Sequence, residues 1–297
     1  MMTEQQRISA FTSDQARAKF LATYTQTFDR LWPAAHESLD VVTSFGSTRV
    51  YRSGRTDGTP VVLLSGAGGN SLMWHRHIAQ LSRARPVIAI DTVGEPGASD
   101  QRVPIGTGRE LAGWLDEVLT TLGVTRAHLV GCSYGGWIAV QNALHVPGRA
   151  ATVTLLDPAG FGRVTGRFMM WVIAGGLAGL THAPLRRRLA RPLRNATLRD
   201  DDLMRLAAVT MGFRRRLPAP PTLTDDDLRG ITVPTLALFG ERSQMYDAEQ
   251  VASRIRAQLP AARVEIVPGA GHDLPVYCPD LVAERTIEFI EQAETLA

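Results

Sequence analysis

Ser133 lies at the centre of a Gly-x-Ser-x-Gly segment that spans residues 131–135. A serine in such a turn can act as a nucleophile, because the flanking glycines relieve crowding in a strained bend that exposes the hydroxyl. The bare pattern is also that of an ordinary glycine-rich turn. Here an apolar run at 127–130 precedes it and a helical pattern at 136–144 follows it, and this strand-turn-helix context favours a catalytic serine.

Two more segments whose residues could take part in catalysis follow apolar runs. The glycine-rich loop 65–69 comes after the run 60–64, and His272 comes shortly after the run 264–267. The carboxyl ends of parallel strands meet at one edge of a sheet, where ligands bind. We therefore expect His272 to meet Ser133, and the glycine-rich loop to turn a backbone N–H toward the serine.

The elements that must position these residues follow a regular order. β-rich runs alternate with helical patterns, at 60–65, 87–90, 127–130, 151–156, 235–239 and 264–267. This order predicts an α/β fold with a mostly parallel sheet, and continuous apolarity indicates strands buried on both faces. Two strand-like stretches, 39–45 and 48–52, come before them. Apolar residues from Ala16 to Leu31 recur at helical spacing and predict an N-terminal helix ending near Pro33.

Residues 161–222 interrupt the alternation. They contain no comparable strand, and their 12 Arg and 3 Asp give a net charge of +9, whereas the whole chain carries +3. We predict an inserted helical cap here. The expected organisation is an N-terminal helical extension at 1–38, a core at 39–160 and 223–297, and the cap at 161–222.

Taken with the segments 91–99 and 234–240, these motifs resemble the α/β-hydrolase-fold superfamily over residues 39–295. The resemblance is to a capped, carboxylesterase-like serine hydrolase. It implies an eight-stranded, mostly parallel sheet flanked by helices, and a catalytic triad. It also implies that Ser133 is the nucleophile, that His272 is the general base, and that the backbone N–H groups of Ala67 and Tyr134 form the oxyanion hole.

The triad acid departs from the family pattern. The family commonly places Asp three residues beyond the glycine that corresponds to Gly240, and this chain has Ser243 there. Asp157 directly follows the run 153–156 and is the expected acid, although it could instead cap a turn. Asp247 is the alternative acid, but it is also placed to cap a helix.

These residues predict a cofactor-free serine hydrolase that cleaves a carboxylic ester or thioester, with residues 168–173 lining a pocket for an apolar acyl group. The alternative is a non-hydrolytic or degenerate member of the fold, with ligand-binding or cyclase or perhydrolase-type activity. No metal is expected, because His75 and His77 have no further ligands nearby and are expected on a helix surface. Cys132 is expected to be a small buried hydrophobe.

The partner is expected to be a small-molecule apolar ester or thioester. Arg186–Arg188 and Arg214–Arg216 could meet an anionic substrate or an acidic carrier protein, or form a solvated face. Contact of the cap with a membrane surface is a further alternative. We expect no nucleic-acid binding, and the longest apolar run, 168–180, is too short for stable membrane insertion. Two cysteines and no secretory signal predict a cytoplasmic location. The oligomeric state stays open.

Overall fold

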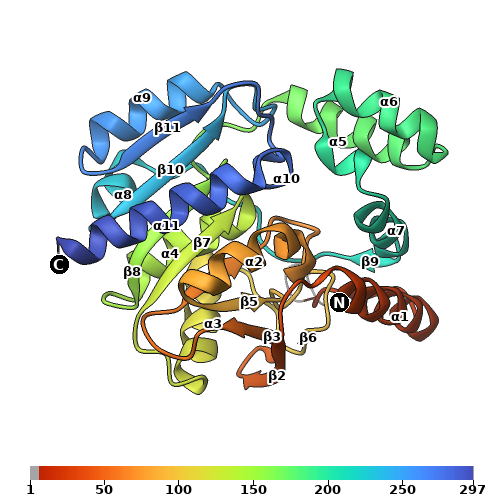
Figure 1. The fold of residues 1–297 in the computed structure, drawn as a ribbon, viewed down its shortest axis with the longest axis horizontal. Helices are drawn as coiled ribbons and strands as arrows, with labels where there is room; N and C mark the ends of the chain where they lie inside the picture. Colours follow the sequence, from red (N-terminus) through yellow and green to blue (C-terminus); the bar gives the residue numbers. More distant parts are fainter. Residues whose placement is uncertain (1–6, 297) are drawn as a thin grey trace.

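A twisted, mostly parallel sheet forms the centre of the computed structural model, which describes residues 7–296 (Figure 1). The strands lie in the order β11-β10-β8-β7-β4-β5-β3-β2, which confirms the predicted fold. Their bounds are β2 (His36–Thr43), β3 (Gly46–Gly54), β4 (Val61–Leu64), β5 (Pro86–Ile90), β7 (Ala127–Cys132), β8 (Ala150–Leu156), β10 (Thr235–Gly240) and β11 (Arg263–Val267). A two-residue strand, β6 (Asp100–Gln101), adds a ninth member beside β3.

Strand direction divides this sheet into two parts. Every neighbouring pair from β5 through β4, β7, β8 and β10 to β11 is parallel, whereas β2, β3 and β6 pair in the antiparallel sense. The central strands β4, β7 and β10 are buried at every residue, as expected for strands covered on both faces. The parallel part brings the carboxyl ends of its strands to one edge.

Helices cover both faces of the sheet. On one face, α3 (Gly108–Thr121), α4 (Tyr134–His145), α8 (Asp225–Gly230) and α9 (Ala248–Gln258) contribute to a large apolar core. On the other face, a second core forms beneath α2 (His75–Ala84), α11 (Pro279–Thr295) and the short helices η2 (Ser71–Trp74) and α10 (Leu274–Tyr277).

The predicted N-terminal helix is α1 (Asp14–Leu31), which begins at a Ser13 cap. Its buried aromatic face packs onto the sheet, and the ring of Phe28 stacks on Tyr51 of β3 with centroids 4.1 Å apart. Because β2 begins at His36, the expected extension at 1–38 includes the first residues of the sheet. Residues 1–6 of that extension lie outside the described residues.

The interval predicted to be a cap is mainly helical. It contains α5 (Gly166–Gly179), α6 (Ala183–Leu193), η3 (Ala196–Arg199) and α7 (Asp201–Thr210), and it projects from one side of the sheet (Figure 1). It also contains a two-residue strand, β9 (Phe213–Arg214), which pairs antiparallel with β1 (Ala10–Phe11). The Thr12 N–H donates to the Gly212 carbonyl at 2.8 Å, so the N-terminal segment is attached to the end of the cap.

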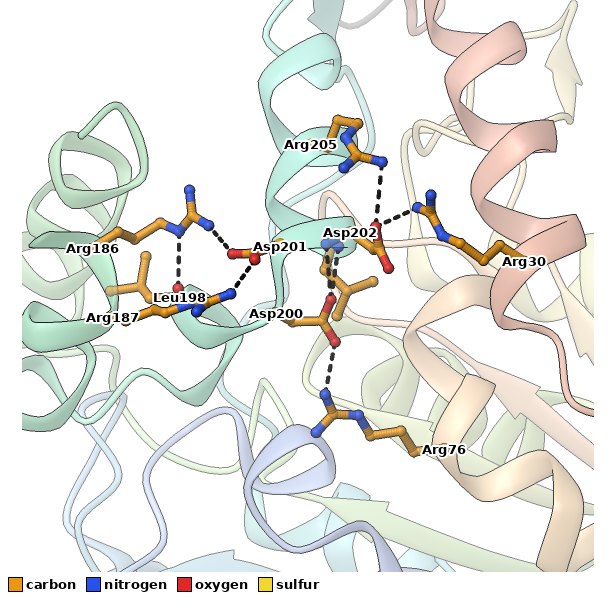
Figure 2. Close-up of polar contacts among 10 residues, drawn as sticks. Arg30, Arg76, Arg186, Arg187, Leu198, Asp200, Asp201, Asp202 and Arg205 are labelled. Atoms are coloured by element: carbon orange, nitrogen blue, oxygen red, sulfur yellow. Dashed lines mark hydrogen bonds and ion pairs between the residues drawn. The ribbon is translucent and has the colours of Figure 1, made fainter. Parts of the chain in front are cut away.

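Three consecutive aspartates at the start of α7 form ion pairs, two of them with helices outside the cap and one within it (Figure 2). Asp200 caps α7 by accepting from the N–H groups of Asp202 and Leu203, at 3.1 and 3.0 Å. Each carboxylate also pairs with arginine from another helix: Asp200 with Arg76 of α2 at 2.8 Å, Asp201 with Arg186 and Arg187 of α6, and Asp202 with Arg30 of α1. Asp200 thus combines a helix cap with an ion pair, while Asp201 and Asp202 lie in the first turn of α7.

The helices of residues 7–296 are too short or too polar to cross a lipid bilayer.

Candidate active site

The candidate site lies at the carboxyl edge of the parallel strands. Ser133 follows β7 and Asp157 follows β8, while His272 lies in the loop after β11. Backbone hydrogen bonds continue the sheet into this edge: the Ser133 N–H donates to Leu156 O at 3.0 Å, and the Asp157 N–H donates to Leu238 O at 2.8 Å. The first residue beyond each of these two strands is thus fixed by the neighbouring strand.

Ser133 occupies a strained turn. Its φ of +50° lies in the left-handed region, which non-glycine residues rarely adopt. The turn needs glycine on both sides: a Cβ at Gly131 would lie 2.3 Å from the Gly135 carbonyl oxygen, and one at Gly135 would lie 2.2 Å from the Leu64 carbonyl oxygen. The Gly-x-Ser-x-Gly pattern therefore has a steric cause in this fold.

His272 and Asp157 are in contact. Nδ1 of His272 lies 2.6 Å from Oδ2 of Asp157, whose side chain is fully buried. The hydroxyl of Ser243 donates to the same oxygen at 2.7 Å. Ser243, which occupies the position where the family commonly has its acid, thus donates a hydrogen bond to the Asp157 carboxylate.

Asp247, the alternative acid, lies at the N-terminus of α9. Its exposed carboxylate accepts from the Gln250 N–H at 2.9 Å and caps that helix. Of the two candidate carboxylates, the structure brings Asp157 to His272.

Two backbone N–H groups were expected to form the oxyanion hole. Tyr134 is the first residue of α4, so its N–H has no acceptor within the helix and lies at the positive end of the helix dipole. Ala67 lies in the loop after β4, and the neighbouring Gly66 lies against the serine, since a Cβ there would be 3.4 Å from the Ser133 Cβ. The loop and the helix start therefore flank Ser133.

Sequence reasoning missed the pair that supports this loop. Oε2 of Glu95 accepts from the Gly68 N–H at 2.9 Å, and its Oε1 accepts from Arg215 at 2.6 Å. The guanidinium of Arg215 also lies 4.2 Å from the centre of the Tyr134 ring. The Glu95 side chain is 1% exposed, and burial raises the pKa of this carboxyl although Arg215 opposes the shift. Because 120 positions separate the two residues, no local pattern could have linked them.

The cap covers the histidine through α5. The rings of Phe168 and Trp171 meet His272 edge-on, with centroids 4.9 and 5.9 Å away. The expectation that the whole run 168–173 lines a pocket is corrected by the exposure of its other large members. Met169, Met170, Val172 and Ile173 are 58%, 71%, 46% and 56% exposed. Helical geometry turns these four side chains away from the histidine.

Gln244 and the cap also hold the loop that carries His272. The His272 N–H donates to Oε1 of Gln244 at 3.1 Å, and the next residue, Asp273, accepts from the Thr197 N–H of the cap at 3.1 Å. Burial raises the pKa of the Asp273 carboxyl. Cap and histidine loop are therefore directly bonded, a link that sequence reasoning missed.

Cys132 is buried, as predicted. Burial raises the pKa of the Cys132 thiol, which disfavours a thiolate beside the serine. No cluster of three or more metal-ligating side chains occurs within residues 7–296. The prediction that His75 and His77 lie on a helix surface is wrong for His77, which is 1% exposed, because the second core covers its side of α2.

Several cap arginines expected to meet an anion are already paired. Arg186 and Arg187 share Asp201, and Arg215 pairs with Glu95. The two triplets are therefore not simple solvated clusters, and exposed arginines such as Arg188 are the ones available to a partner.

Comparison with known proteins identifies the family to which this chain belongs. The model of the alpha/beta hydrolase family matches residues 61–285, which include the serine, aspartate and histidine described above. The chain belongs to this family. It is 29% identical to carboxylesterase YbfK of Bacillus subtilis over 94% of this chain and 96% of that one. It is 30% identical to the uncharacterized carboxylesterase nap of the same organism, over 93% of each chain.

Solved structures agree with the family assignment. The crystal structure of naproxen esterase (carboxylesterase NP) from Bacillus subtilis superposes with a TM-score of 0.82 at 29% identity. The similarity covers 93% of this chain and 98% of the esterase.

Proposed function

We propose that this protein is a serine carboxylesterase that cleaves a carboxylic ester or thioester with an apolar acyl part. The observation that carries the proposal is the 2.6 Å contact between His272 and Asp157 at the sheet edge that also holds Ser133 in its strained turn. Carboxylesterase relatives that cover nearly the whole chain support ester hydrolysis.

In the proposed reaction, His272 Nε2 takes the proton of the Ser133 hydroxyl as Oγ bonds to the substrate carbonyl carbon. The tetrahedral intermediate collapses, the alcohol or thiol leaves with the proton from His272, and an acyl-enzyme remains. Water then attacks the acyl carbon, gives its proton to His272, and releases the acid with Ser133 restored. The Asp157 carboxylate holds the Nδ1–H tautomer and stabilises the imidazolium that forms in each half-reaction.

The N–H groups of Tyr134 and Ala67 would stabilise the negative oxygen of each intermediate. Loss of one such donor typically costs about 3–4 kcal/mol of transition-state stabilisation. Both donors are backbone groups, so their placement depends on the α4 start and on the loop that Glu95 holds.

The preference for an apolar acyl part rests on the two aromatic rings that contact His272. Phe168 and Trp171 lie directly above the base, where they favour an apolar substrate group and exclude water. No cofactor takes part in this chemistry. The argument for a non-hydrolytic role was that Ser243 stands where the acid is expected. The contact between Asp157 and His272 weakens this argument, because it supplies a carboxylate from another position.

The test is covalent labelling with a fluorophosphonate, located by peptide mass spectrometry. We expect the adduct on Ser133 in the wild type, no adduct in Ser133→Ala, and strongly slowed labelling in His272→Ala and Asp157→Asn. Asp247→Asn is the matched control, because it makes the same carboxylate-to-amide change at a helix cap that asparagine also supports.

Hydrolysis of p-nitrophenyl butyrate should follow the same order among the variants. A folded wild type that neither takes up the label nor hydrolyses this ester would contradict the proposal. Equal losses in Asp157→Asn and Asp247→Asn would contradict the assignment of Asp157 as the acid.

A further inference from the structure

The outer face of α5 is an apolar surface that no part of the described chain covers. Its large exposed side chains recur at helical spacing, with exposed fractions of 71% at Met170, 56% at Ile173, 64% at Leu177 and 66% at Leu180. Side chains three and four residues apart lie on one face of a helix, so these four form a continuous stripe. The inner face carries Phe168 and Trp171, which pack on His272.

The stripe is not needed for the packing of the cap. A separate small core, built from Ala178 of α5, Ala190 of α6 and Leu198 of η3, joins the two helices from the inside. A helix that is apolar on all sides is normally buried or lies in a membrane. The outer face of α5 is therefore free to meet something apolar.

The charges around the stripe indicate the nature of that partner. Residues 158–199 contain eight arginines and no aspartate or glutamate. Four of these arginines, Arg163, Arg167, Arg188 and Arg191, are exposed and form no ion pair within residues 7–296. Arg163 and Arg167 lie at the start of α5, and Arg188 and Arg191 lie one turn apart on α6.

We propose that the outer face of α5, with these four arginines, binds the surface of anionic phospholipid bilayers. The apolar stripe would enter the boundary between headgroups and acyl chains, and the guanidinium groups would pair with lipid phosphates. A 14-residue helix is about 21 Å long, shorter than the roughly 30 Å hydrocarbon layer, so α5 would lie in the interface and not span it.

Charge argues against a second copy of the chain as the occupant. A symmetric contact through α5 would bring two segments of net charge +8 together, with no carboxylate in either to compensate. An anionic bilayer offers, in one surface, an apolar layer for the stripe and negative charge for the arginines.

Vesicle co-sedimentation of the full chain tests the proposal. At 50 mM NaCl the wild type should bind phosphatidylcholine vesicles that contain 30% phosphatidylglycerol and should bind pure phosphatidylcholine vesicles at least tenfold more weakly. Raising NaCl to 500 mM should weaken binding to the anionic vesicles, because salt screens the phosphates. Equal binding to both vesicle types, or no binding to either, overturns the proposal.

Two sets of variants assign the binding to this face. Met170→Ser/Ile173→Ser/Leu177→Ser should lower partitioning on anionic vesicles at least tenfold. Arg188→Gln/Arg191→Gln should lower it about 25-fold, since each basic residue near the surface contributes about fivefold. Arg52→Gln/Arg126→Gln removes the same charge at the opposite edge of the sheet and should lower it less than threefold.

Circular dichroism and thermal melting verify that each variant is folded. Sedimentation velocity supplies the competing outcome. A wild-type dimer that becomes monomeric in the triple-serine variant would make α5 an interface between copies and overturn the lipid proposal, as would equal losses in the two arginine pairs.

Discussion

At the scale of single residues, one oxygen of the candidate site receives two donors. Oδ2 of Asp157 accepts from His272 at 2.6 Å and from Ser243 at 2.7 Å. The Ser243 hydroxyl lies within hydrogen-bond distance of this Asp157 oxygen. A carboxylate at position 243 would therefore lie close to the point that the Asp157 oxygen occupies. Positions 157 and 243 are thus two places from which a carboxylate could reach one point beside the histidine.

Moving the acid between these two positions is the first prediction. Asp157→Asn should lower kcat by about 10³–10⁴-fold, because the histidine loses its orienting carboxylate. Adding Ser243→Asp to that variant should restore at least a tenfold part of the loss, measured as kcat for p-nitrophenyl butyrate. A folded double variant that is no more active than Asp157→Asn would contradict the shared position.

His77 gives a prediction about pH. Burial lowers its pKa from an ordinary value near 6.5 to about 3, and neither ring nitrogen has a hydrogen-bond partner within residues 7–296. Between these values the unfolded state binds a proton that the folded state does not, so the free energy of unfolding falls as pH falls below 6.5. The slope for this group is about 1.4 kcal/mol per pH unit.

Replacing the imidazole isolates this contribution. Relative to the wild type, His77→Phe should gain free energy of unfolding steadily from pH 6.5 to pH 4.5, measured by urea denaturation at each pH. Above pH 7 the difference between the two proteins should be constant. A constant difference over the whole range would mean that His77 takes up its proton at the same pH in the folded and the unfolded state.

At the scale of elements, the Glu95–Arg215 pair joins the cap connector to the loop that carries Ala67. Removing one member of a buried ion pair leaves the other charge without compensation, at a cost of about 3–5 kcal/mol. Because the Arg215 side chain is 27% exposed, we expect the lower end of this range for Arg215→Met. Glu95→Gln should cost less, since its amide oxygen can still accept from the Gly68 N–H.

The double variant Glu95→Gln/Arg215→Met should be more stable than the sum of the single changes predicts. We expect a coupling free energy of at least about 1 kcal/mol, obtained from urea denaturation of all four proteins. Strictly additive effects would mean that the two side chains contribute independently.

The sequence could predict elements that depend on local patterns, but not contacts between residues far apart in the chain. Apolar runs and their alternation are local, so the parallel strands, the α1 helix and the place of the cap were all predictable from short windows. The Glu95–Arg215 and Asp273–Thr197 contacts join residues far apart in the chain, and no window contains both members. The exposed side of α5 was also hidden, because a helix apolar on every side does not indicate which face is buried.

For the molecule as a whole, the aspartates at the start of α7 join the cap to two other helices (Figure 2). Asp200 is the most buried of them, with 8% of its side chain exposed, and it combines a helix cap with the Arg76 ion pair. Asp202 and its partner Arg30 are more exposed, at 23% and 43%. Their contributions to stability should therefore differ.

Thermal melting measures that difference. Asp200→Ala should lose about 2 kcal/mol, a fall in melting temperature of about 3 °C, because it removes both a cap and a sheltered ion pair. Asp202→Ala should lose under about 1 kcal/mol, and 1 M NaCl should abolish most of that smaller loss. Equal losses at low salt would contradict the ranking by burial.

The pairing of β1 with β9 has a consequence for the order of events at the ribosome. Ala10 and Phe11 leave the exit tunnel long before their partners Phe213 and Arg214 have been added to the chain. At about 5–20 residues per second, the delay is on the order of 10–40 s. During that time Phe11 has no Phe213 ring to pack against, so the pairing of β1 is completed only after β9 has been made.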